Sequence, residues 1–196
     1  MPTVMLGELA RDVFVGRSLS RIKRASDAPA TPVVSARDVQ DILPPVETLE
    51  TIQTVFGRDL EGARLEAGDV VVTARGPVRA AVAEDEHSGA IAGPNLVVVR
   101  LGPGPLPYVL AAYLRHPATQ ERLQASTRGT ATTGLGVSDL RALLLRRPGA
   151  YGLETTSEIV VLTNRYASAA LTAVEKRRQL ALRFAYDALL PDPANT

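Results

Sequence analysis

Basic and hydroxyl side chains gather in three short segments of this 196-residue chain. They are residues 16–24 (GRSLSRIKR), a glycine-proline turn at 75–79 and a polar loop at 128–133. Arginine binds phosphate or a guanine edge with a planar fork, and hydroxyls also bind phosphate. For each single residue, an ordinary solvated surface loop is an equal alternative. The candidate DNA-binding residues are Arg17, Ser18, Ser20, Arg21, Lys23, Arg24, Arg75, Gly76, Arg79, Arg128, Gly129, Thr130, Thr132 and Thr133.

The sequence contains no recognisable catalytic or metal-binding pattern. It has no cysteine, and its two histidines, His87 in a polar tip and His116, lack metal-ligand spacing. The glycines at 102–105 alternate with prolines, which remove the N–H donors of a phosphate loop. The acids Glu84–Glu86 could hold a hard cation, but such a run is more often a solvated tip. No nucleophile elbow and no adenine-methylation signature occurs. We therefore expect a non-catalytic chain without a metal.

Charge is distributed unevenly although the formal net charge is only +1. Residues 1–24 sum to +3, residues 25–99 to −7 and residues 100–150 to +5. Folding could place the two basic regions on one face, which would favour a polyanionic partner. Nearly all basic residues are arginine, a bias that a GC-rich genome would also produce. Aromatic residues make up only 4% of the chain, which disfavours binding of single strands.

No apolar run is long enough to span a membrane, and the first residues do not resemble a secretory signal. These features, together with the missing cysteines, predict a cytoplasmic protein.

Residues 1–149 predict an α/β body with a mixed sheet and flanking helices. The pattern indicates helices over 5–13, 108–114 and 118–123 and helical turns at 38–43 and 139–143. It indicates strands over 32–36, 48–56, 70–73, 78–83, 95–101 and 143–146.

Residues 152–190 predict a long helical arm, followed by a tail at 191–196. From Thr156 to Leu190 there is no proline or glycine, and Ser157 could cap the helix start. Small and apolar residues repeat every seven positions, which is typical of a seam that pairs with another helix. A helix folded back onto its own body is the alternative. The seam residues are Val160, Asn164, Ala167, Leu171, Val174, Arg178, Ala181, Ala185 and Ala188.

Taken in order, these segments resemble a known family. The first segments are VMLGELARDVFVGRSLSR, PVVSARDVQDI and LEAGDVVVTARG, the last of which belongs to two predicted strands and the turn between them. After these come PYVLAAYLRHPATQERLQ, the loop STRGTATTGLG and the long helix. Nearly the whole chain resembles one target recognition domain of the specificity subunit of type I restriction–modification systems, followed by one spacer helix of that subunit. Full-length specificity subunits carry two of each, so this chain is similar to a half-subunit.

The resemblance implies a non-catalytic subunit that reads one half of a bipartite duplex DNA site. The arm would form a coiled coil with an identical chain or with another half-subunit, and would separate two bodies by up to about 15 base pairs. Methyltransferase subunits, which bind S-adenosylmethionine, would dock on the assembly and perform the chemistry. Pro77 and the alanine-rich seam depart from the family pattern.

Two other classes of function remain open at this stage. The chain could be an adaptor or decoy that binds methyltransferase or specificity subunits without reading DNA. It could also be an enzyme that uses the acids Glu84–Glu86 with a metal.

Overall fold

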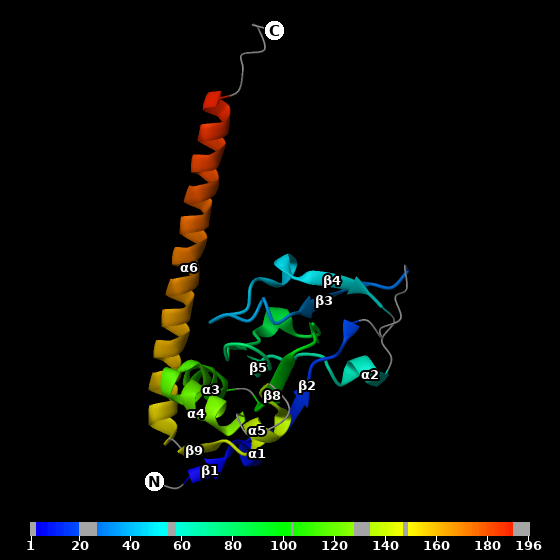
Figure 1. Ribbon diagram of the computed structural model, residues 1–196, viewed down its shortest axis with the longest axis vertical. Helices are drawn as coiled ribbons and strands as arrows, with labels where there is room; N and C mark the ends of the chain where they lie inside the picture. The colour runs from blue at the N-terminus through cyan, green and yellow to red at the C-terminus, as the bar shows by residue number, and fades with distance from the viewer. Residues whose placement is uncertain are drawn as a thin grey trace, which may run out of the picture. The chain divides into compact units, whose positions relative to one another are not determined.

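The computed structural model describes residues 3–19, 27–54, 58–102, 104–127, 134–146 and 149–189 (Figure 1). The chain divides into two compact units, Met1–Val160 and Val161–Thr196. The predicted mixed sheets with flanking helices, and the long C-terminal helix, are confirmed.

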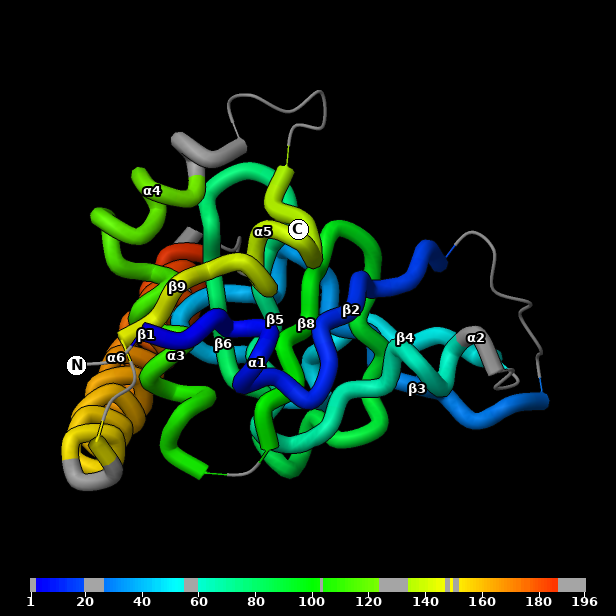
Figure 2. The backbone as a smooth tube through the Cα atoms, turned by 90° about the horizontal axis from the view of Figure 1, so that it is seen from below, coloured from blue at the N-terminus to red at the C-terminus, as the bar shows by residue number. Residues whose placement is uncertain are grey.

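A four-stranded antiparallel sheet forms the centre of the first unit, with the strand order β2–β8–β5–β6 (Figure 2). Its strands are β2 (Asp12–Val15), β5 (Asp69–Thr73), β6 (Ala80–Val82) and β8 (Leu96–Arg100). The central strands β5 and β8 are valine-rich and buried on both faces, which explains why their sequences read as continuous apolar runs.

Each face of this sheet contributes to a different core. Val70 and Val99 point into a core shared with Leu110 and Leu114 of helix α3 (Leu106–Arg115). Val71 lies on the opposite face, in a core shared with Val34 and the second sheet. Successive residues of a strand point to opposite faces, so β5 holds the two layers together.

The second sheet has the order β4–β3–β7 and combines antiparallel and parallel pairing. Strand β3 (Ala30–Val34) runs antiparallel to β4 (Glu50–Gln53) and parallel to β7 (Ile91–Ala92). Figure 1 shows β3 and β4 on one side of the four-stranded sheet. Three short helices, η2 (Val46–Thr48), α2 (Arg58–Glu61) and η3 (Asp85–His87), lie in the connections.

Helices and a small strand pair cover the other side of the central sheet. Helix α4 (Pro117–Thr127) follows α3, and α5 (Val137–Arg141) leads into strand β9 (Leu144–Arg146). Strand β9 pairs antiparallel with β1 (Thr3–Met5). The helix predicted over 139–143 and the strand predicted over 143–146 are therefore present, with slightly shifted ends.

The helix predicted over Met5–Val13 is wrong. This segment contains the end of β1, a single turn of helix α1 (Leu6–Leu9) and the start of β2. Val13 pairs with Val99 of β8, and this long-range ladder outweighs the weak helical spacing of the segment. The helical turn predicted at 38–43 is also absent. Asp38 instead closes a tight turn by accepting hydrogen bonds from the N–H and the hydroxyl of Ser35.

A buried ion pair fastens β5 to β8. The Asp69 carboxylate is 1% exposed and accepts two hydrogen bonds from Arg100, from Nε at 3.0 Å and from Nη2 at 2.8 Å. Arg100 also donates to the carbonyl of Arg64 and lies over the ring of Phe14. The hydrogen bond to Asp69 raises the pKa of Arg100 above its usual value, against the opposing effect of burial.

Helix α6 (Ala150–Leu189) has 40 residues and is thus about 60 Å long. It begins two residues before the arm predicted at 152–190 and six residues before Thr156, so Ser157 is not its cap. Ser157 is instead a buried residue in the third turn. From Ala169 to Tyr186 every side chain is exposed. Among the residues that the structure describes, no helix has the length and apolar character needed to cross a membrane.

Candidate nucleic-acid interface

The beginning of β8 is the point where two of the predicted segments meet. Val15, the last residue of β2, pairs with Val97, and Thr73, the last residue of β5, pairs with Leu96. The chain therefore leaves β2 and β5 at the same end of the sheet. The first exit leads to Arg17 and the second to Arg75.

Backbone hydrogen bonds hold both exits against the turn that precedes β8. On one side, Gly16 N–H donates to the carbonyl of Leu96 at 2.9 Å, and Arg17 N–H to that of Ala92 at 2.8 Å. On the other side, Ala74 N–H donates to the carbonyl of Asn95 at 2.8 Å. A Cβ on Gly16 would lie 1.8 Å from the carbonyl oxygen of Gly93, so only glycine permits this approach.

Gly134 and Leu135, which follow the third predicted segment, lie at the same place. Leu135 N–H donates to the carbonyl of Ala74 at 2.8 Å. A Cβ on Gly134 would lie 2.7 Å from that same carbonyl and 3.5 Å from Cγ of Arg75. The residue that follows the predicted loop 128–133 is thus packed against the turn that carries Arg75.

Three exposed arginines lie at this end of the sheet. Arg17, Arg75 and Arg79 are exposed, and none has a carboxylate partner within the described part of the chain. Gly76, between the last two, has a φ of 75°, which gives the turn a conformation that favours glycine. Free guanidinium groups on a fixed backbone are suited to binding phosphates.

Some other arginines have structural roles and are paired. Arg100 is bound to Asp69 and Glu66. Arg115 donates to the carbonyl of Asp41 and lies 3.5 Å from its carboxylate, and burial lowers the pKa of Arg115. Arginine content alone therefore does not locate a binding surface.

The described candidates are Arg17, Ser18, Arg75, Gly76 and Arg79, all of them exposed. The remaining candidates, Ser20, Arg21, Lys23, Arg24, Arg128, Gly129, Thr130, Thr132 and Thr133, lie outside the described residues. The sequence interpretation missed Asn95, which it placed at the start of a strand. Its Gly-Pro-Asn context was the available signal, because these residue types favour turns.

The polar tip predicted around His87 is partly wrong, since His87 is buried. Its Nδ1 accepts a hydrogen bond from Glu84 N–H at 3.1 Å, and its Nε2 lies 3.0 Å from the carbonyl of Pro44. Glu84 in turn accepts from the hydroxyl of Tyr108. Within the described ranges, no three acidic or histidine side chains are grouped closely enough to hold a metal ion.

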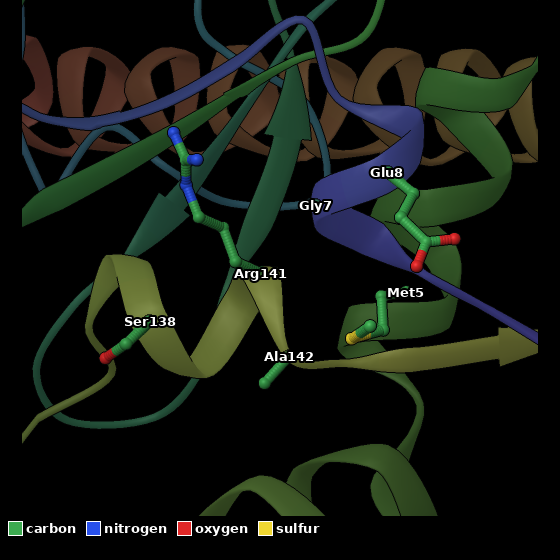
Figure 3. Close-up of a pocket in the computed structure, with 6 residues that line it drawn as sticks. All are labelled: Met5, Gly7, Glu8, Ser138, Arg141 and Ala142. Atoms are coloured by element: carbon green, nitrogen blue, oxygen red, sulfur yellow. The ribbon is translucent and has the colours of Figure 1, made fainter.

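The residues that line a shallow hollow between α1 and α5 are not arranged for catalysis. Met5, Gly7, Glu8, Ser138, Arg141 and Ala142 line it. Figure 3 shows the Arg141 side chain pointing away from Glu8 and Met5. Arg141 is instead 3.3 Å from a carboxylate oxygen of Asp12. The hollow thus contains no paired acid and base among its described lining residues.

Helix α6 presents apolar side chains on two sides. Two of the larger predicted seam residues, Leu171 and Val174, are 71% and 61% exposed. Val160, Asn164 and Ala167 are partly buried, whereas Arg178, Ala181 and Ala185 are exposed. The side chain of Ala188 is not among those that the structure describes. A second stripe lies roughly 115° around the helix axis from the seam at 3.6 residues per turn. Its large exposed members are Ile159, Leu162, Tyr166, Leu180 and Phe184.

No protein-family model and no curated protein matches the sequence. Solved structures do match the fold. The HsdS subunit from Thermoanaerobacter tengcongensis aligns with a TM-score of 0.57 and 20% identity over 88% of this chain. The type I restriction–modification S subunit from M. genitalium aligns with a TM-score of 0.59 and 11% identity over 97% of this chain.

The fold is that of a type I specificity subunit. A third matched structure is described as the structural basis of complex assembly and conformational transition of the type I R-M system. It aligns with a TM-score of 0.58 and 19% identity over 95% of this chain. The chain spans less than half of each matched chain, at 44%, 39% and 46% of their lengths. A single target recognition domain with one long helix fits this coverage.

Proposed function

We propose that this chain is the DNA-recognition subunit of a type I-like restriction–modification system and reads one half of a bipartite duplex site. One observation carries the proposal. The exits of β2 and β5 meet at one end of a sheet whose fold is that of specificity subunits, and Arg17, Arg75 and Arg79 there have no carboxylate partner among the described residues. Phosphate contacts from such arginines would set the register of the protein on the duplex.

The chain spans less than half of the specificity-subunit chains that it matches. One target recognition domain would read one half of a site. Two copies, or this chain and another half-subunit, would together read both halves. Homo-oligomers most often have twofold symmetry, which suits a site with two half-sites.

Helix α6 would provide the contacts of this assembly. The seam around Leu171 and Val174 would pair with the same helix of a partner in a coiled coil. The second stripe around Tyr166 and Leu180 would remain open for methyltransferase (modification) subunits. Catalysis and S-adenosylmethionine binding would belong to those subunits, so the chain itself is not an enzyme.

Selection from a pool of randomised duplexes tests the proposal. The chain is purified together with a type I methyltransferase subunit and bound to the pool at physiological salt, and the retained duplexes are sequenced. We expect enrichment of one bipartite sequence and a specific affinity at least about 10³-fold above non-specific binding. Retention of all sequences alike would refute a recognition role.

The adaptor or decoy function is the second candidate, and the exposed apolar stripes of α6 favour it. A variant with Arg17, Arg75 and Arg79 replaced by glutamine separates the two functions. If the chain is an adaptor, this variant forms the methyltransferase complex and binds the selected duplex as the wild type does. If the chain reads DNA, the complex forms but its affinity for the duplex falls.

A further inference from the structure

The turn between β7 and β8 contains an unusual residue. Asn95 has a φ of 61° and is the one non-glycine residue with a positive φ among those that the structure describes. Pro94 precedes it, and proline followed by a residue at positive φ is typical of a type II turn. Asparagine tolerates this conformation, but glycine would satisfy it without any side chain.

The turn is fixed in the middle of the candidate interface. The hydrogen bonds from Gly16 and Arg17 hold the residues on either side of it, and the bond from Ala74 ends on the carbonyl of Asn95 itself. Asn95 therefore lies between the segment that carries Arg17 and the turn that carries Arg75. These three backbone hydrogen bonds leave the turn little freedom to move.

The side chain of Asn95 is available to a ligand. The residue is exposed, and its amide makes no hydrogen bond to a described residue. An amide offers one donor and one acceptor side by side. Adenine presents the complementary pair, N7 and N6–H, in the major groove, and asparagine binds both together. Arginines on both sides would hold the phosphates while the amide reaches a base.

We propose that Asn95 is a specificity-determining residue that contacts the major-groove edge of an adenine in the recognised half-site. This inference rests on the proposed function, and it adds which residue reads the site and which base that residue contacts. A side chain on a rigid turn between phosphate-binding groups is preorganised for such a contact. The arginines supply affinity for any sequence, whereas Asn95 supplies preference for one base pair.

The variant Asn95→Gly removes the amide while keeping the turn, because glycine adopts a φ of 61° without strain. Selection from randomised duplexes is repeated for wild type and N95G, each in complex with the methyltransferase subunit. We expect wild type to require adenine at one position where N95G accepts other bases. The discrimination lost should be about 5- to 150-fold, as expected for one bidentate contact.

A second measurement identifies the atoms. Each adenine of the selected site is replaced in turn by 7-deazaadenine, which lacks the N7 acceptor. At one adenine we expect a loss of about fivefold or more for wild type and no loss for N95G. Because the amide would contact no phosphate, the dependence of affinity on salt should be the same for both proteins.

The outcomes separate this inference from the proposed function. If wild type enriches a sequence and N95G enriches the same one with the same preference, Asn95 does not read a base and only the inference fails. If N95G weakens binding to all sequences alike, the side chain contacts the backbone, and the inference fails in the same way. If wild type enriches nothing, the proposed function fails as well. Thermal unfolding of N95G, expected at the wild-type temperature, shows that the turn is intact.

Discussion

Replacing Arg17, Arg75 and Arg79 with glutamine should change the salt dependence of DNA binding by a calculable amount. All three guanidinium groups are exposed and have no described carboxylate partner, so each can neutralise a phosphate. Each phosphate contact on B-DNA contributes about 0.9 to the slope of log K against log salt. Removing three contacts should therefore reduce the slope by about 2.7.

The same figure predicts a difference in affinity. Between about 50 and about 200 mM salt, a slope difference of about 2.7 means that wild-type affinity falls about 40-fold more than that of the triple variant. For each single arginine-to-glutamine variant, wild-type affinity should fall about 3.5-fold more than that of the variant over the same range of salt. Fluorescence anisotropy of a labelled duplex carrying the selected sequence, titrated with the methyltransferase complex at several salt concentrations, measures the slope directly.

Arg37→Gln is the matched control. The Arg37 side chain is 71% exposed, but its Nη2 lies 3.1 Å from Glu50 and its Nε lies 3.7 Å from Asp38, so acids of the protein already neutralise it. Its slope should equal that of wild type. An unchanged slope in the triple variant, or an equal reduction in R37Q, would refute the assignment of the interface to the end of β8.

Three further predictions concern the scaffold and the arm. Asp69→Ala should lower the free energy of unfolding by about 3 kcal/mol in urea denaturation, because it removes the buried partner of Arg100 and leaves only the exposed Glu66. Adding Arg100→Met should recover part of that loss. A double variant no more stable than D69A would contradict this explanation. Gly16→Ala should destabilise the chain by about 2 kcal/mol or more and weaken DNA binding, because the new Cβ would overlap the carbonyl of Gly93. Gly62→Ala should be tolerated, because its Cβ would meet only the tip of the Arg17 side chain, at 3.9 Å. Equal melting temperatures for the two variants would show that the close approach is unimportant. Replacing Leu171 and Val174 with aspartate should convert an associated chain to a monomer in sedimentation velocity. The control Thr172→Asp should leave the association unchanged. An unchanged mass for both variants would exclude the seam as the pairing surface.

The sequence by itself predicted the elements whose patterns have a local cause. The valine runs of β5 and β8 were recognisable because strands buried on both faces carry apolar residues at every position. Helix α6 was recognisable because a long stretch without proline or glycine leaves no residue that would end it. Its cap was wrongly expected at Ser157 because Gly152 lowers helix propensity, although the helix continues through Gly152.

Only the tertiary structure decided which residues act together. The segment around Val13 became a strand because β8, more than eighty residues away, offered it a partner, and no local pattern contains that information. His87 became a core residue because the carbonyl of Pro44 lies beside its ring. Arg17, Asn95 and Arg75 are far apart in the sequence, and the register of β2 and β5 on β8 brings them to one end of a sheet. Spacing along the chain indicated that arginines were available, and strand pairing determined where they meet.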